Sequence, residues 1–146
     1  MNAKEILKRC GVKTLTIEPH RNIREAIRLL AESDRGALVV VDRRERILGI
    51  LTERDILKAH ARRFDGMRGF TVSDLATKDV IIGLAEDSPE RLAATMAEGR
   101  IRHLPILSGK TLLGVLSMRD LVDAQAQRGQ AEIRHLKDHI SGNHLN

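Results

Sequence analysis

One 13-residue stretch occurs twice in the chain, and this repeat constrains the fold more than any other feature. Residues 47–59 read ILGILTERDILKA, and residues 112–124, which lie 65 positions later, read LLGVLSMRDLVDA. Six of the 13 positions are identical and five more carry conservative replacements. Each copy passes from apolar residues through a glycine to a hydroxyl residue, Thr52 or Ser117, with an aspartate three positions later. The pattern predicts a strand that leads directly into the N-terminus of a helix.

The residues of this motif are compatible with two interpretations. A hydroxyl residue followed three positions later by an aspartate can form a capping box, which requires no ligand. The same groups can instead face a nucleotide, with the N–H groups at the helix start binding a phosphate and the carboxylate chelating the ribose diol. The glycine at a fixed offset, the arginine before each aspartate and the duplication of the whole unit favour the nucleotide site.

The segments around the motif recur in the same order. We expect β-segments at Thr14–Ile17 and Val80–Ile82, helices that begin after Asn22 and after Ser88, and hairpins over residues 37–51 and 103–116. In the first motif helix, the apolar spacing places Ile56, Leu57 and His60 on the inner side. The order strand, helix, strand, strand, helix therefore occurs twice in the chain. This repetition predicts an α+β fold of two similar units that complete each other's core.

The predicted boundaries follow from this order. We expect an N-terminal helix in residues 1–12, a first repeat in residues 13–64 and a linker in residues 65–73. A second repeat follows in residues 74–128, and a C-terminal helix or tail occupies residues 129–146.

Composition limits the partners. The 146 residues are 42% hydrophobic but include only two phenylalanines and no tryptophan or tyrosine, so the core must be aliphatic. The net charge of +5 and the isoelectric point near 9.9 indicate an anionic partner. Single-stranded nucleic acids usually stack on aromatic side chains, which are almost absent here. A small phosphorylated ligand therefore fits the charge at least as well as a nucleic acid does.

Other classes of site find little support. Cys10 is the only cysteine, which excludes an intrachain disulfide, and no apolar run is long enough to cross a membrane. We therefore expect a soluble cytoplasmic protein. His135 and His139 lie one helical turn apart, but without the further ligands of a zinc site they indicate a solvated helix face. No set of nucleophile, base and orienting residue occurs, so we predict that the protein is not an enzyme and holds no metal.

The repeated order of elements, each copy ending in Gly-apolar-Leu-Thr/Ser-x-Arg-Asp, resembles the cystathionine-β-synthase (CBS) domain, and the tandem pair resembles a Bateman module. The resemblance covers about residues 13–128. It implies two repeats that pack sheet to sheet about a pseudo-twofold axis, with clefts between them that bind adenosine nucleotides.

The resemblance also implies roles for single residues. Asp55 and Asp120 would hold ribose hydroxyls, Thr52 and Ser117 would lie against the ribose or the first phosphate, and Arg54 and Arg119 would contact phosphate. Arg102 and His103 belong to a segment, RIRHLP, that resembles a basic phosphate-binding segment of a nucleotide-sensing family member. The other candidate residues are the expected adenine walls Thr14, Thr16, Val80 and Ile82, together with Val115 and with Gly36 and Ala37, which occupy the positions of Arg102 and His103 in the first repeat.

The first repeat departs from the family pattern. It has Gly36 and Ala37 in place of the basic pair, and Val39 in place of the usual proline. We therefore expect two unequal clefts, with the one that uses Ser117, Arg119 and Asp120 as the better nucleotide site.

Our leading hypothesis is a stand-alone, non-catalytic regulatory module that senses AMP, with ATP, ADP or NAD(H) as competing ligands. The resemblance implies a homodimer, and the lack of an effector domain implies signalling to a partner protein. The alternative is a basic nucleic-acid-binding adaptor or a structural dimerisation module without a small-molecule ligand.

Overall fold

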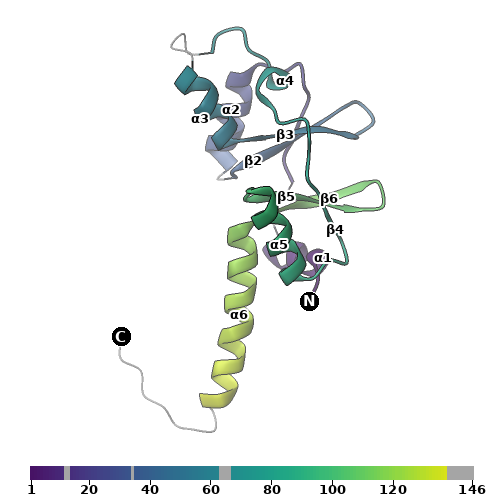
Figure 1. Ribbon diagram of the computed structural model, residues 1–146, viewed down its shortest axis with the longest axis vertical. Coiled ribbons are helices and arrows are strands. Elements are labelled where there is room, and N and C mark those ends of the chain that lie inside the picture. The colour runs from purple at the N-terminus through teal and green to yellow at the C-terminus, as the bar shows by residue number, and fades with distance from the viewer. Residues whose placement is uncertain (12–13, 34, 63–66, 138–146) are drawn as a thin grey trace.

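A three-stranded sheet lies at the centre of each repeat (Figure 1). The computed structural model describes residues 1–11, 14–33, 35–62 and 67–137, with side chains described up to residue 129. Parts of the predicted linker (65–66) and tail (138–146) therefore lie outside the described residues, as does the side chain of His135. The first sheet has the order β1-β2-β3 and the second the order β4-β5-β6. In each sheet the first strand pairs in parallel with the second, and the second and third form an antiparallel hairpin.

The elements follow the predicted order. The first repeat contains β1 (Thr16–Ile17), α2 (Ile23–Ser33), β2 (Ala37–Val41), β3 (Ile47–Thr52) and α3 (Glu53–Arg62). The second contains β4 (Gly83–Leu84), α5 (Pro89–Gly99), β5 (His103–Ser108), β6 (Thr111–Ser117) and α6 (Met118–Lys137). Two more helices, α1 (Ala3–Cys10) and α4 (Val72–Leu75), precede the first strand of each repeat. The α+β prediction with two repeated units is thus confirmed.

Two details of the prediction were wrong. The strand β4 lies at Gly83–Leu84, whereas we expected it at Val80–Ile82. In α3, Leu57 is 69% exposed and His60 is also exposed, while Ile56 and Ala59 pack against the core. Adjacent helical positions are about 100° apart, so Leu57 cannot share the inner face with Ile56 and Ala59. The helix α6 continues past residue 128 without a break, which joins the predicted tail to the second repeat.

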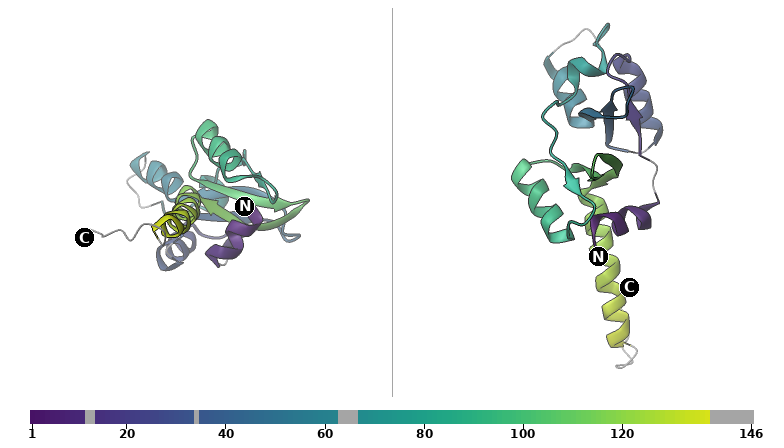
Figure 2. Two further views of the ribbon diagram at one scale, coloured as in Figure 1. Left: turned by 90° about the horizontal axis from the view of Figure 1, so that it is seen from below. Right: turned by 90° about the vertical axis from the view of Figure 1, so that its right-hand side faces the viewer.

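The helices that precede each repeat pack on the opposite sheet. Ala3 and Ile6 of α1 are fully buried among Leu92, Leu104 and other core residues of the second repeat. Val72 of α4 is fully buried in the core of the first repeat. Figure 2 shows α1 against the second sheet, away from β1–β3. We therefore use "first unit" for β1–β3 with α2, α3 and α4, and "second unit" for β4–β6 with α5, α6 and α1.

Equivalent backbone hydrogen bonds hold the two exchanged helices. In the second unit, the N–H groups of Ala3 and Lys4 donate to the carbonyl oxygens of Asp87 and Ala85, at 2.9 and 3.0 Å. In the first unit, the N–H groups of residues 72 and 73 donate to the carbonyl oxygens of residues 21 and 19, both at 2.9 Å. Because Asp87 and Ala85 lie 66 positions after residues 21 and 19, the exchange repeats in both units.

A small apolar cluster joins the two sheets. It consists of Val39, Val41 and Val115, with Ile47 and Leu112 packed against it. All five residues lie on the hairpins, two of them in the second unit. Branched aliphatic side chains suit this position because they pack tightly on a pleated surface. The sheets therefore meet through their hairpins, and the helices α3 and α6 begin beside this contact (Figure 1).

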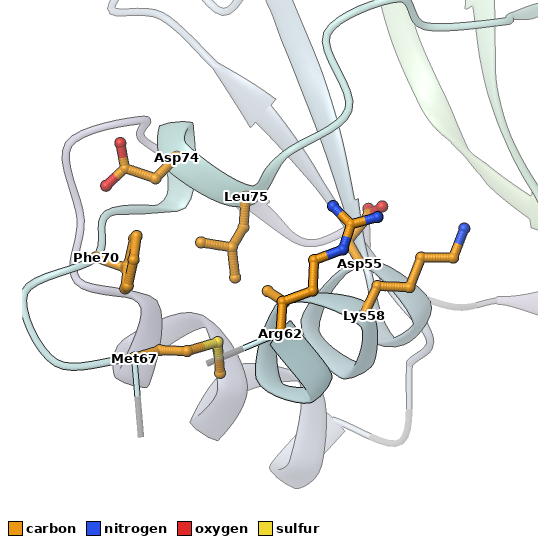
Figure 3. Close-up of a pocket in the computed structure, with 8 residues that line it drawn as sticks. Asp55, Lys58, Arg62, Met67, Phe70, Asp74 and Leu75 are labelled. Carbon is orange, nitrogen blue, oxygen red and sulfur yellow. The ribbon is translucent and has the colours of Figure 1, made fainter. Parts of the chain in front are cut away.

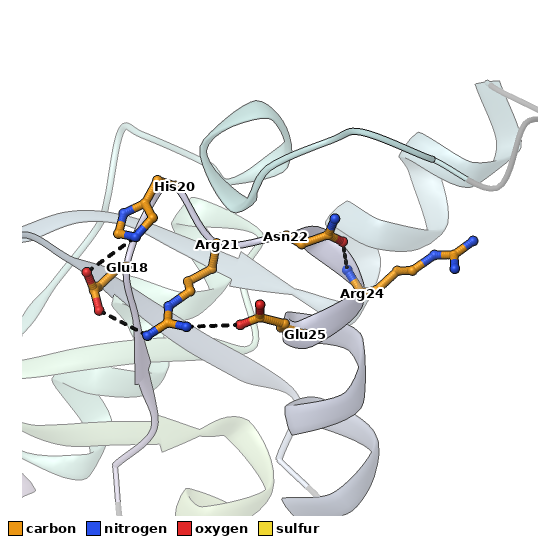
Figure 4. A network of polar contacts seen from close by, with 6 residues as sticks. All are labelled: Glu18, His20, Arg21, Asn22, Arg24 and Glu25. Carbon is orange, nitrogen blue, oxygen red and sulfur yellow. Dashed lines mark hydrogen bonds and ion pairs between the residues drawn. The ribbon is translucent and has the colours of Figure 1, made fainter.

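Polar contacts fix the entry to α2 (Figure 4). Asn22, the predicted N-cap, accepts a hydrogen bond from the N–H group of Arg24 at 2.8 Å through its side-chain oxygen. Arg21 pairs with Glu18 and Glu25, both at 3.5 Å. His20 lies 3.6 Å from the carboxylate of Glu18. These pairs are exposed, so they orient the turn more than they stabilise it.

None of the helices that the described residues form combines enough length with enough apolar character to cross a bilayer.

Candidate functional site

The two copies of the motif form the same local structure. In each, the strand ends at the hydroxyl residue and the helix begins at the next position. The Ser117 N–H group donates to the Asp120 carboxylate at 2.8 Å, and the Asp120 N–H group donates to Ser117 Oγ at 3.0 Å. The equivalent bonds between Thr52 and Asp55 measure 2.9 and 3.3 Å. The capping box is therefore present in both copies, and it points each carboxylate across the start of its helix.

The two aspartates have different further neighbours. Asp55 also accepts hydrogen bonds from the hydroxyls of Thr52 and Thr77, both at 3.1 Å, so both of its carboxylate oxygens are engaged. Asp120 lies beside the thiol of Cys10, and burial together with this negative charge raises the pKa of that thiol. A thiol is a weaker hydrogen-bond donor than a hydroxyl. Asp120 is therefore held less firmly than Asp55 and is the better acceptor for the hydroxyls of a ligand.

The larger cleft, which we call the Asp120 cleft, has a volume of about 960 Å³. It is lined from the first unit by Gly36, Ala37, Arg35 and Glu53, with Thr14 and Leu15 before β1. The second unit contributes Arg102, His103, Val115, Ser117, Met118, Arg119, Asp120, Val122 and Asp123. Nine of the fifteen residues selected from the sequence line this one cavity: Thr14, Gly36, Ala37, Arg102, His103, Val115, Ser117, Arg119 and Asp120.

The smaller cleft, which we call the Asp55 cleft, has a volume of about 340 Å³. Five of the residues selected from the sequence line it: Thr52, Arg54, Asp55, Arg102 and His103. Its other lining residues are Ile50, Glu53, Lys58, Thr77, Asp79, Ile81, Arg100 and Ile101. Both volumes lie within the range of small-molecule sites, about 300–1,000 Å³. The inequality of the two clefts agrees with the departure of the first repeat from the family pattern.

His103 lies at the contact between the two units. A methyl group added to Gly36 would lie 2.6 Å from His103 Nε2, so only glycine leaves room for the ring. Burial lowers the pKa of His103, and the charges of Arg35 and Arg102 lower it further, against the opposing effects of Glu53 and Asp120. At neutral pH the ring is therefore uncharged, and it can accept or donate one hydrogen bond in either cleft.

Sequence reasoning missed several residues of the clefts, among them Arg35 and Glu53. Arg35 lines the Asp120 cleft and donates from Nη2 to the carbonyl oxygen of Val115 at 3.3 Å, which links the first unit to the second. Glu53 lines both clefts. Comparison of the repeats offered no signal for either residue, because Ile101 corresponds to Arg35 and Met118 corresponds to Glu53.

Three of the residues selected from the sequence do not line either cleft. Thr16 lines a separate cavity of about 270 Å³ beside the hairpin turns. Val80 and Ile82 are absent from the described linings, and their neighbour Ile81 faces the Asp55 cleft instead. The true β4 begins one residue after Ile82, which accounts for this difference.

A further cavity of about 420 Å³ lies between α3 and α4 in the first unit (Figure 3). Met67, Phe70 and Leu75 form its apolar side, and Arg62 and Asp74 are among the polar residues around it. Asp55 and Lys58 line this cavity as well as the Asp55 cleft. Its lining residues all belong to the first unit and include one arginine, whereas each of the two clefts is lined by several arginines and by residues of both units, as suits a phosphorylated ligand.

In the part of the chain that the structure describes, no three His, Cys, Asp or Glu side chains come together in a way that could hold a metal ion.

Comparison with known proteins gives a consistent result. The model of the CBS domain family matches residues 3–62 and again residues 72–127. An uncharacterized 17.7 kDa protein of Acidianus ambivalens is 38% identical over 84% of this chain and 73% of its own length. The chain spans a much smaller part of some other relatives, such as 21% of an inosine-5'-monophosphate dehydrogenase of Methanocaldococcus jannaschii.

Solved structures resemble the fold closely. The CBS-domain containing protein ATU1752 from Agrobacterium tumefaciens superposes with a TM-score of 0.81 at 34% identity, over 86% of this chain and 99% of that one. A CBS domain protein from Pyrobaculum aerophilum, solved in complex with AMP, superposes with a TM-score of 0.72 at 31% identity. That match covers 82% of this chain and 89% of the other.

Proposed function

The chain belongs to the CBS domain family and carries two CBS repeats, and on that basis we propose that it is a non-catalytic regulatory module that binds an adenosine nucleotide in the Asp120 cleft. We expect AMP as the ligand, with ADP, ATP and NAD(H) as competitors. The observation that carries the proposal is the convergence of nine residues selected from the sequence on one cavity of about 960 Å³. The AMP complex of the Pyrobaculum protein supports the choice of ligand.

The cleft offers a partner for each part of a nucleotide. The Asp120 carboxylate would accept hydrogen bonds from the two ribose hydroxyls. The Ser117 hydroxyl and the N–H groups at the start of α6 would face the phosphate, because a helix N-terminus favours an anion. Arg102 and Arg119 line the same cavity and would neutralise the phosphate charge.

The adenine ring would lie on aliphatic side chains. Leu15, Ala37 and Val115 line the cavity together with the methyl group of Thr14. Apolar walls with a few polar groups are typical of small-molecule sites. This arrangement would let a chain with only two aromatic residues bind a base without stacking it on an aromatic ring.

Nucleotide binding would be transmitted by a change in the surface that a partner protein contacts. A ligand shifts an equilibrium only as far as it prefers one arrangement over another, so nucleotide binding would change how the units sit or how two copies pack. Leu57 and Val122 occupy equivalent positions of α3 and α6 and are 69% and 54% exposed. We expect this pair to contribute to a homodimer contact, and an effector protein to receive the output. The proposal includes a cytoplasmic location, which the single cysteine supports.

The test is a thermal-shift panel of AMP, ADP, ATP, NAD, NADH and S-adenosylmethionine, each followed by calorimetry. Ligand at about 100 times Kd adds roughly 2.7 kcal/mol, which corresponds to an increase in Tm of roughly 5–10 °C. Asp120→Ala should remove binding in the Asp120 cleft and reduce the shift to what the Asp55 cleft alone supplies, whereas Glu98→Ala, which changes an exposed carboxylate of α5 outside both clefts, should preserve the full shift. Circular dichroism would check that Asp120→Ala folds, since loss of the cap alone costs about 0.5–2 kcal/mol.

The same experiment tests the alternatives. A basic nucleic-acid adaptor would bind long polyanions with strong salt dependence, and this binding would survive Asp120→Ala. A structural dimerisation module would dimerise and show no shift with any of the six compounds. Either result would refute the nucleotide proposal.

A further inference from the structure

Three residues line both clefts, and we call them the shared wall: Glu53, Arg102 and His103. The Asp120 cleft and the Asp55 cleft are thus separated by one layer of side chains. Whatever fills one cleft contacts the residues that bound the other.

The backbone of the shared wall is fixed to the site helices. The Arg102 carbonyl oxygen accepts a hydrogen bond from the N–H group of Met118, the first residue of α6, at 2.9 Å. At the equivalent place in the first unit, the Gly36 carbonyl oxygen accepts from the N–H group of Glu53, the first residue of α3, at 3.2 Å. The start of each strand is therefore tied to the start of the helix whose N-terminus faces its cleft.

The side chains of the shared wall carry an unequal distribution of charge. Arg102 is exposed and forms no ion pair with the residues that the structure describes, so its guanidinium is available to a ligand. Position 36, which corresponds to position 102, is a glycine, and position 37 is an alanine. A symmetric pair of repeats would have a basic residue for each cleft at this place. At this pair of positions the chain has only Arg102, and both clefts share it.

We propose that the two clefts are negatively coupled, because a phosphate bound by Arg102 in one cleft removes that cation from the other. The inference rests on the proposed nucleotide function and concerns the regulation of the same site. Two effects act in the same direction. The second phosphate loses a charge-assisted hydrogen bond, and it meets the negative charge of the first phosphate across one layer of side chains.

The coupling has a definite thermodynamic form. If a nucleotide in the Asp120 cleft weakens binding in the Asp55 cleft by some factor, then a nucleotide in the Asp55 cleft weakens binding in the Asp120 cleft by the same factor. Couplings between sites in proteins commonly amount to about 5–150-fold. The module would then respond to nucleotide concentration over a wider range than two independent sites of equal affinity.

The experiment is calorimetric titration with AMP of the wild type, of Asp120→Ala and of Asp55→Ala. Each variant isolates one cleft, and the two variants check each other if one of them folds poorly. We expect the Asp55 cleft to bind AMP at least about 5-fold more tightly in Asp120→Ala than in the second binding event of the wild type. Adding Arg102→Ala to both proteins should weaken binding and lower this ratio to the part that phosphate repulsion alone supplies. Arg100→Ala, which changes an arginine that lines only the Asp55 cleft, should leave the ratio unchanged.

Adenosine provides a control that needs no mutation. It lacks the phosphate and should fill both clefts with a ratio near one in the wild type. A ratio near one for AMP, or a ratio that Arg102→Ala leaves unchanged, would overturn the proposed coupling through Arg102. So would an Asp120→Ala variant that is folded and binds no AMP while the wild type binds one. Absence of binding by AMP and adenosine in the wild type would instead refute the proposed function itself.

Discussion

A methyl group at Gly36 tests the contact on which the shared wall depends. The Cβ of Gly36→Ala would lie 2.6 Å from His103 Nε2 and 2.7 Å from Cε1, about 0.8 Å closer than ordinary van der Waals contact. The ring is only half-buried and can rotate, so we expect a cost at the lower end of the overpacking range, about 1 kcal/mol. In a domain of this size, that lowers Tm by roughly 2–4 °C.

The sign should reverse when the ring is removed. Gly36 does not have a positive φ, so alanine fits its backbone. In a His103→Ala background, Gly36→Ala should therefore stabilise the protein by about 0.4–1 kcal/mol, through a smaller entropy of the unfolded chain. Gly129→Ala serves as the control, because no atom lies within 4 Å of the added methyl group and a helical alanine should raise Tm.

The assay is thermal and urea unfolding of the wild type, both single variants and the double variant. The double-mutant cycle gives the interaction between positions 36 and 103 directly. If Gly36→Ala raises Tm in the wild type, or changes it equally in both backgrounds, the packing of His103 against Gly36 is not as described. The position of the shared wall would then need to be revised.

Three further predictions concern other parts of the fold. Gly49→Ala should lower the free energy of unfolding in urea by more than Gly36→Ala does. The methyl group at position 49 would lie 2.8 Å from the carbonyl oxygen of Thr77, and a backbone atom cannot rotate away as the His103 ring can. An equal or smaller loss for Gly49→Ala would contradict this geometry. Ile6→Ala should cost about 2–5 kcal/mol and Leu48→Ala less than about 0.5, since the first side chain is fully buried and the second is 43% exposed. Similar losses in urea unfolding would argue against the packing of α1. Because folding lowers the pKa of His103, the unfolded chain binds this proton at a higher pH than the folded chain does, so the free energy of unfolding should fall as the pH drops below about 6.5. Between pH 7.5 and 5, Tm should fall less steeply in His103→Gln than in the wild type. An unchanged slope would show that His103 does not contribute.

The parts of the fold that sequence could predict are those that local pattern determines. Both hairpins and both motif helices lie where the apolar runs and capping residues indicate. The strand β4 was misplaced because β-branched residues at 80–82 are better strand formers than Gly83. Tertiary packing overrides this local preference and places the strand at Gly83. A Cβ there would lie within 2.9 Å of the side chains of Ile106, Leu104 and Leu92. Glycine is needed there so that α5 can pack closely on the sheet.

The site was predictable where the motif is duplicated and unpredictable where the two units meet. Ser117, Asp120 and their counterparts are recognised by comparing one repeat with the other. Arg35 and Glu53 acquire their positions only when the first unit packs against the second, and nothing near them in the chain marks this. The sharing of Arg102 by two clefts is a property of that packing as well.

The exchange of α1 between units has a consequence for synthesis of the chain. The residues of α1 leave the ribosome before the strand β6 against which they pack, because β6 is made roughly 100 residues later. At about 5–20 residues per second, the apolar side of α1 waits on the order of 5–20 s for its partner. The first unit receives α4 much sooner, so it can close while the second is still being made. The helix α1 is thus made before the other described elements and is among the last of them to pack.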